Sequence, residues 1–302
     1  MDTLNGKGMY LWISSRVEGG DPERIAQTAA EAGLTHVLIK VADGQYAYNI
    51  DPKTGKDNVP AVVDALRTRG IQAWGWQYIY GRNPAAEAAM AIQRTKQFNL
   101  DGFVVNAEVE FKQKGMEAQA RQYMQTLRAG LPGVPVGFSS YRYPTLHRPL
   151  PFETFLEYSD INMPQVYWVQ ASNPAAQLRR SVSEHQALNV WRPIVPTGCA
   201  YPDGAWAPTA GQVTEFLQAC KDLGLSGANF WEWYYARKDL ALWAAVSAFP
   251  WAPPVEPEAE PAPVVDDPEP APVKVETQPY VSPEVLKDWQ AMRAAAAGQG
   301  RG

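Results

Sequence analysis

The chain has 302 residues, of which 46% are hydrophobic and 20% charged, a balance typical of folded globular proteins that excludes global disorder. It carries 27 Lys and Arg against 32 Asp and Glu, and the net charge of −5 excludes a chain-wide basic surface for nucleic acid. The length suits one (β/α)8 barrel with an appendage, or two ordinary domains.

Segments typical of strands and helices alternate through residues 1–250. The expected strands are residues 8–14, 36–41, 71–80, 102–108, 135–139, 161–167, 193–197 and 227–233. The expected helices are residues 22–32, 59–69, 84–98, 116–129, 152–158, 174–188, 210–223 and 239–248, with Asp21 and Asn173 as expected caps. Eight strand–helix pairs over this length predict an α/β fold of the (β/α)8 TIM-barrel class.

A doubly wound open sheet is the alternative architecture. It would usually show fewer strand–helix pairs and a glycine-rich phosphate turn after the first strand. The first expected strand instead ends in Ser14-Ser15-Arg16. The sequence therefore favours the barrel.

The composition changes after Trp251. Residues 250–272 hold nine prolines, six acidic residues and no basic residue, which predicts a disordered, extended linker over residues 251–279. Residues 280–302 form an expected helical tail, in which residues 284–297 carry apolar side chains at helical spacing. Either this helix docks on a protein partner, or it is a tail without function.

Signals for export or membrane insertion are not evident in the sequence. The polar start of the chain does not resemble a signal peptide, and no stretch of about 18 apolar residues predicts a membrane span. Cys199 and Cys220 are expected to be reduced thiols. We expect synthesis in the cytoplasm, and an extracellular target would require release by lysis, a virion or a non-classical route.

The expected carboxyl ends of the strands are rich in aromatic and uncharged polar groups. Functional groups of a barrel lie at this end, and flat aromatic faces with polar neighbours suit sugar rings. The alternative is that the aromatic residues fill the barrel core, as we expect for Trp74 and Trp231. The candidate binding residues are Trp12, Trp76, Tyr78, Tyr141, Gln165, Tyr167 and Trp233.

Asn106 and Glu108 are the most informative pair in the sequence. They lie two residues apart on an expected strand and therefore face the same side. If that side is the barrel interior, desolvation raises the pKa of Glu108 and suits it to act as a general acid. The alternative reading leaves Glu108 and Glu110 solvated or paired with a nearby lysine.

The segment Asp101-Gly-Phe-Val-Val-Asn-Ala-Glu108 resembles the strand-four signature of chitinase-type family 18 glycoside hydrolases, Asp-Gly-x-Asp-x-Asp-x-Glu. It is also similar to the Asp-x-Glu of lysozyme-type family 25 barrels. Residues 162–167 resemble the strand-six Met-x-Tyr region, and residues 227–233 resemble the strand-eight segment whose tryptophan floors the sugar subsite. The resemblance implies that Glu108 is the proton donor and that the substrate's N-acetyl group assists.

Asn106 departs from both signatures, which carry Asp at this position. In one reading the barrel binds sugar without turnover. In another the amide holds the acetamido group, as the resemblance to family 85 endo-N-acetylglucosaminidases, whose motif also ends in Asn-x-Glu, implies. A two-carboxylate mechanism with Glu232 as the second acid is also open, unless Glu232 points outward and pairs with Arg237 or Lys238.

Other chemistries have little support. No His, Cys or carboxylate spacing indicates a metal site, and no cofactor is expected. Lys40 could form a Schiff base, but an ion pair with Asp43 or Glu108 is the simpler reading. The leading interpretation is a glycoside hydrolase acting on an N-acetylhexosamine glycan such as peptidoglycan or a chitin-like polymer. The alternative is a non-catalytic glycan-binding or structural protein of a virion or surface assembly.

Overall fold

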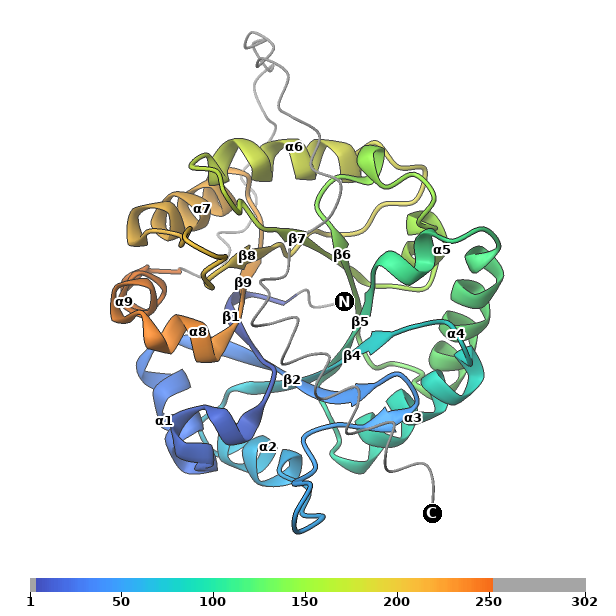
Figure 1. Cartoon of the computed structure of the whole chain (residues 1–302), viewed down its shortest axis with the longest axis horizontal. Helices are drawn as coiled ribbons and strands as arrows, with labels where there is room; N and C mark the ends of the chain where they lie inside the picture. Colours follow the sequence, from blue (N-terminus) through green and yellow to red (C-terminus); the bar gives the residue numbers. More distant parts are fainter. Residues whose placement is uncertain (1–3, 252–302) are drawn as a thin grey trace, which may run out of the picture.

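Eight parallel strands close into a barrel within residues 4–251, the part of the chain that this computed structural model describes (Figure 1). The strands are β1 Gly6–Leu11, β2 Leu34–Asp43, β4 Gln72–Ile79, β5 Gly102–Ala107, β6 Val136–Tyr141, β7 Ile161–Val166, β8 Thr197–Cys199 and β9 Gly227–Trp231. Strand β1 pairs with both β2 and β9, which closes the ring. The (β/α)8 prediction is confirmed, and the open doubly wound sheet is excluded.

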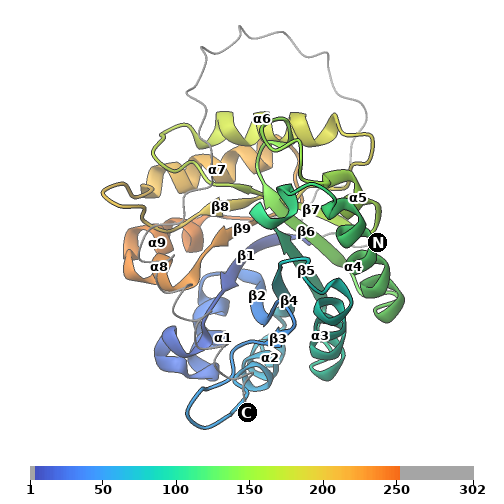
Figure 2. The same ribbon diagram turned by 45° about the vertical axis from the view of Figure 1, so that its right-hand side comes forward.

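Helices surround the barrel on the outside, as Figures 1 and 2 show. Neighbours in sequence pack against each other, for example α1 against α2 and α6 against α7. The helices are α1 Pro22–Glu31, α2 Val59–Thr68, α3 Pro84–Gln97, α4 Met116–Gly130, α5 Phe152–Glu157, α6 Pro174–Gln186, α7 Ala210–Asp222, α8 Trp233–Lys238 and α9 Leu240–Ala248.

Local capping explains where several helices begin. Asp21 accepts hydrogen bonds from the backbone N–H groups of residues 23 and 24, with Pro22 in the first turn of α1. Thr209 and Gln212 form a reciprocal capping box at α7. Asn173 occupies the expected N-cap of α6, but its side chain accepts a hydrogen bond from the Gln177 side chain and not from the backbone.

Several strand boundaries differ from the expectation: β1 ends at Leu11 where the strand was expected to reach residue 14, β2 is longer at both ends, and β8 and β9 differ as follows. Pro193 and Pro196 lack the N–H that a strand needs, and β8 begins only at Thr197, after an isolated bridge at Ile194. The last strand ends at Trp231, where residues 232 and 233 were expected to continue it. A two-residue strand β3, Tyr46–Ala47, adds a hairpin to β2.

A polar layer fills the barrel near the amino ends of the strands. Asn229 Oδ1 lies 2.6 Å from His36 Nε2, and both side chains are fully buried. A Cβ on Gly8 would lie 2.0 Å from His36 Nε2, so only glycine leaves room for the imidazole. This layer lies at the end of the barrel opposite the mouth.

The start and end of the described chain meet at that same end of the barrel. The Lys7 ammonium donates to the carbonyls of Val246, Ser247 and Phe249, at and just after the carboxyl end of α9. The Trp251 indole donates to the Ser226 carbonyl just before β9. The predicted linker from residue 252 onward and the predicted helix 284–297 lie outside the described residues. No helix within 4–251 is long and apolar enough to cross a membrane.

Candidate functional site

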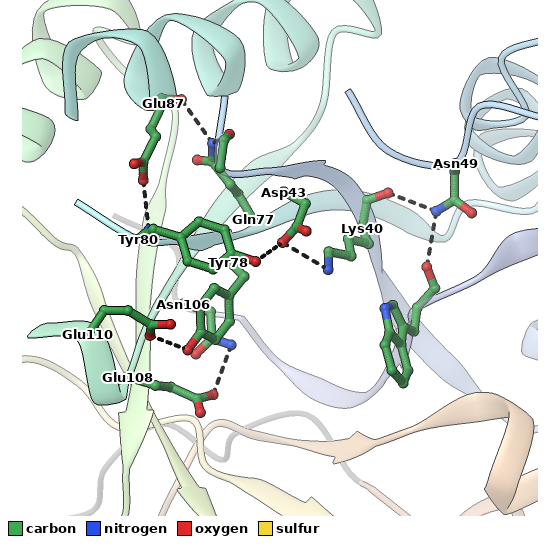
Figure 3. A network of polar contacts seen from close by, with 12 residues as sticks. Lys40, Asp43, Asn49, Gln77, Tyr78, Tyr80, Glu87, Asn106, Glu108 and Glu110 are labelled. Atoms are coloured by element: carbon green, nitrogen blue, oxygen red, sulfur yellow. Dashed lines mark hydrogen bonds and ion pairs between the residues drawn. The ribbon is translucent and has the colours of Figure 1, made fainter. Parts of the chain in front are cut away.

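Three polar side chains form a closed triangle at the carboxyl ends of β5 and β7. Asn106 Nδ2 donates to Glu108 Oε1 over 3.1 Å, a contact shown in Figure 3. Gln165 Nε2 donates to Glu108 Oε1 at 2.9 Å and to Asn106 Oδ1 at 3.0 Å. The structure thus brings together three of the sequence-predicted residues, with both amides directed at one carboxylate.

Glu108 lies just past the end of β5 and keeps part of its side chain open to solvent. Burial raises its pKa, the amide hydrogen bonds from Gln165 and Asn106 oppose that rise, and the charge of Glu110 adds to it. A carboxyl group with a raised pKa retains its proton at higher pH. It can therefore donate that proton to a bound group.

Glu110 is held by a tyrosine. The Tyr78 hydroxyl donates to Glu110 Oε2 at 2.6 Å (Figure 3). Tyr78 lies against Tyr80, with ring centroids 5.0 Å apart, and the Tyr80 hydroxyl donates to Asp43 at 3.1 Å. A row of polar contacts therefore runs along the carboxyl ends of β2, β4 and β5.

Lys40 ends this row as a buried cation. Its ammonium lies 3.3 Å from Asp43 Oδ1, so the ion pair with Asp43 is present. The rings of Tyr48 and Trp76 flank it, with centroids 4.2 and 4.9 Å from Nζ. Only 1% of the Lys40 side chain is exposed, because strand and aromatic groups enclose it.

Four aromatic rings pack together across the barrel mouth. The Trp231 ring lies 5.3 Å from Trp76, 5.4 Å from Tyr10 and 5.8 Å from Trp12. Trp12 and Trp76 are buried, while Trp231 remains partly exposed. The indole N–H groups of Trp12 and Trp76 are buried with no hydrogen-bond partner among the described residues.

Trp233 lies elsewhere than expected. It is fully buried at the start of α8, packs on Trp243, and donates its indole N–H to Glu18. Trp231, which was expected in the core, lies at the end of β9 and is the tryptophan of this segment at the mouth. Trp231 and Trp233 are two residues apart and would face the same side of one continuous strand. Because β9 ends at Trp231, the two side chains lie in different surroundings.

Glu232 lies apart from the Glu108 triangle. Its buried carboxylate accepts hydrogen bonds from the backbone N–H groups of Tyr234 and Tyr235, so it caps α8. Burial raises the pKa of Glu232 to about 7. The two backbone hydrogen bonds and the charge of Arg16 oppose this rise. The expected partner Arg237 pairs with Glu18. The structure shows no contact that joins Glu232 to Glu108.

Two further predicted residues lie beside the triangle. Tyr141 is the last residue of β6, lies in register with Gln165 and stacks on His147, with ring centroids 3.9 Å apart. Tyr167 packs edge-on against Tyr201, and its carbonyl accepts a hydrogen bond from Arg142. His147 could not be identified as a site residue from the sequence, because it lies on a loop away from any expected strand.

We looked for a metal site and for a reactive thiol in the described part of the chain. No set of three or more His, Cys, Asp or Glu side chains there could hold a metal ion. Cys199 and Cys220 are free and buried, and burial raises the pKa of both thiols.

No family model matches the chain, and no curated protein matches it. Solved structures do. The C-terminal domain of a putative chitinase from Desulfitobacterium hafniense matches with a TM-score of 0.62 at 10% identity, over 81% of this chain and 99% of that one. A family 18 N-acetylglucosaminidase from Paenibacillus barengoltzii matches with a TM-score of 0.57 at 12% identity, over 81% and 99%.

A family 2 β-galacturonidase from Eisenbergiella tayi matches with a TM-score of 0.60 at 13% identity over 85% of this chain. The match covers 53% of that enzyme, so the chain spans about half its length. These likenesses concern the backbone arrangement. The protein has the (β/α)8 fold that family 18 chitinases and other glycoside hydrolases also have.

Proposed function

We propose that the protein is a glycoside hydrolase that cleaves an N-acetylhexosamine-containing glycan, with Glu108 as the proton donor. The observation that carries the proposal is the hydrogen-bonded triangle of the half-buried Glu108 with the buried Asn106 and Gln165 at the barrel mouth. A carboxyl group with a raised pKa is what general acid catalysis at a glycosidic oxygen requires.

The substrate's acetamido group would supply the nucleophile. Glu108 gives its proton to the glycosidic oxygen as that oxygen leaves C1, and the acetamido carbonyl oxygen bonds to C1 in its place. The Glu108 carboxylate then takes a proton from water, and the water oxygen bonds to C1 as the carbonyl oxygen departs. The cycle restores the carboxylic acid and retains the anomeric configuration.

Asn106 would orient the acetamido group. Its Nδ2 is engaged by Glu108, and its Oδ1 accepts one hydrogen bond from Gln165. An amide oxygen has two lone pairs, so Oδ1 retains one for an acetamido N–H. Trp231, at the centre of the four-ring aromatic cluster, would stack on the sugar ring.

The test is release of reducing ends from chitin oligomers and from peptidoglycan. We expect turnover with the parent protein and a loss of at least about a thousandfold with Glu108→Gln, which keeps the shape of the side chain and cannot donate the proton. Glu117→Gln, the same change at an exposed glutamate on α4, is the control. Equal turnover by the parent and Glu108→Gln would exclude this mechanism.

The second candidate is a glycan-binding protein without turnover. Asn106 favours it, because an amide cannot offset the positive charge of an oxazolinium ion as a carboxylate does. In that case the parent releases no reducing ends, and glycan binding persists in Glu108→Gln. An Asn106→Asp variant that gains turnover would show that this one amide suppresses catalysis.

A further inference from the structure

A cationic stack lies on the rim of the mouth beside Glu108. The Lys112 ammonium lies 4.2 Å above the Tyr141 ring, and the other partner of that ring is His147 at 3.9 Å. Lys112 ends the short helix η3, Val109–Lys112, which directly follows Glu108. We call Lys112, Tyr141 and His147 the rim stack.

The rim stack borders the Glu108 triangle. Tyr141 is in register with Gln165 on the neighbouring strand, and Gln165 hydrogen-bonds to Glu108. The charges of Lys112 and Glu108 act on each other's pKa, which also indicates that the two groups are close. A sugar bound at Glu108 would therefore have substituents within reach of Lys112.

Lys112 has no anionic partner of its own in the described part of the chain. Its ammonium lies over the Tyr141 ring, and none of the carboxylates of residues 4–251 forms an ion pair with it. Glu110 is engaged by Tyr78, and Glu108 by the two amides. Lys112 is half-buried, and desolvation lowers the pKa of its ammonium even though the charge of Glu108 opposes that fall.

His147 contributes a second polar group without a partner to the rim stack. The side chain is 9% exposed, and its Nδ1 is buried without a hydrogen-bond partner among the described residues. Burial and then the charges of Lys112 and Arg142 lower the pKa of His147 to about 4. The opposing charge of Glu184 is taken up by Thr145 and Arg180.

We propose that the rim stack binds a carboxylate carried by the glycan, so that the preferred substrate is an acidic N-acetylhexosamine glycan and not neutral chitin. This inference rests on the proposed function. Lys112 supplies the charge, and the His147 ring, which stacks on the same tyrosine, supplies a hydrogen-bonding group. The carboxylate could belong to a lactyl ether, as in muramic acid, or to a uronic acid, and both present the same group to the lysine.

The test measures binding by titration calorimetry in a Glu108→Gln background, which prevents turnover. The probes are a neutral chitin tetramer, a tetramer with lactyl carboxylates, the methyl ester of that tetramer, and a uronate-containing tetramer. We expect at least one of the two carboxylate tetramers to bind about fivefold more tightly than the neutral tetramer. If that one is the lactyl tetramer, its methyl ester should bind no more tightly than the neutral tetramer. Lys112→Met should remove the preference and Lys112→Arg should retain it. The matched control is Lys114→Met, at an exposed lysine two residues away.

The possible results separate the inference from the proposed function. Equal binding of neutral and acidic tetramers, or a preference that survives Lys112→Met, would overturn the rim stack while leaving the hydrolase proposal intact. Absence of binding by every tetramer would overturn both. A preference confined to the lactyl or to the uronate tetramer supports the inference and identifies the source of the carboxylate.

Discussion

A single amide side chain, Gln165, controls two acceptors in the candidate site. Its Nε2 reaches both Asn106 Oδ1 and Glu108 Oε1, and the Asn106 amide is thereby oriented with its own N–H toward Glu108. Each of these hydrogen bonds to Glu108 favours the ionised carboxylate. Gln165 is therefore a positioning residue that also limits how far burial raises the pKa of Glu108.

Replacing Gln165 with leucine tests this role. The ionised form of Glu108 loses a donor, so its pKa should rise, and the fall of kcat/KM at high pH should move up by about one pH unit. We also expect kcat to fall about tenfold or more, because Asn106 is no longer oriented. The measurement is a pH profile of kcat/KM for chitin oligomer hydrolysis.

The comparison variant is Gln122→Leu, at an exposed glutamine on α4. Its pH profile should coincide with that of the parent. A Gln165→Leu profile that stays in place or moves to lower pH would contradict the assigned role.

At this scale, the sequence could reveal part of the site. The two-residue spacing of Asn106 and Glu108 predicts a shared face, and the structure shows their side chains in contact. Gln165 was identified as a candidate, but its hydrogen bond to Glu108 joins two residues that are 57 positions apart in the chain, and the sequence does not show that they meet. The rim stack could not be predicted, since His147 reaches Tyr141 from an irregular loop.

Among the elements, the short helix α8 explains why Glu232 and Trp233 do not lie where the sequence predicts them. The run Gly227–Trp233 looks like one strand, because Trp231 and Trp233 lie on either side of Glu232 at the two-residue spacing of a strand. The strand stops at Trp231, and the Glu232 carboxylate caps a new helix through the Tyr234 and Tyr235 N–H groups. Glutamate is not among the usual N-cap residues, so the sequence carried no clear signal for this boundary. The strand and helix order needed only hydrophobic periodicity and was recovered.

Replacing Glu232 with glutamine tests the capping role and its pH dependence. Burial raises the folded-state pKa of Glu232 to about 7, so its proton stabilises the fold below the unfolded pKa, and this contribution is lost as pH rises through 7. Glutamine keeps a capping oxygen and has no charge. Between pH 5 and pH 8 the parent should therefore lose about 3 kcal/mol of unfolding free energy relative to Glu232→Gln.

Guanidinium unfolding at the two pH values measures this difference. Asp239→Asn makes the same kind of change at the exposed N-cap of α9 and serves as the control. A difference between parent and Glu232→Gln that stays constant from pH 5 to pH 8 would contradict the buried-carboxylate reading.

Across the whole molecule, buried histidines connect acidity to folding. Burial lowers the pKa of His36 in the barrel, and of His185 on α6, to about 4. The unfolded chain binds these protons more readily, so the stabilisation is complete above the unfolded pKa of about 6.5 and is lost as pH falls toward 4. Glu232 acts in the opposite direction over part of this range.

The expected outcome is a steep loss of stability between pH 6.5 and pH 4, in which each of the two histidines contributes about 3 kcal/mol. Urea unfolding at half-unit pH intervals measures the slope. His185→Gln, which removes one titrating group, should flatten the slope over this range. An unchanged slope in that variant would mean that His185 does not titrate with folding, and replacement of the neighbouring exposed Gln186 by alanine controls for the change at α6.

The attachment of Lys7 to the end of α9 has a consequence for how the protein can be handled. Lys7 is hydrogen-bonded to residues 246–249 at the end of the barrel that lies away from the Glu108 triangle. Trp251, the last described residue, lies at the same end. A solid support or fusion partner coupled at residue 251 would therefore hold the barrel with its mouth directed outward. Long insoluble polymers could then approach an immobilised molecule without crossing its point of attachment.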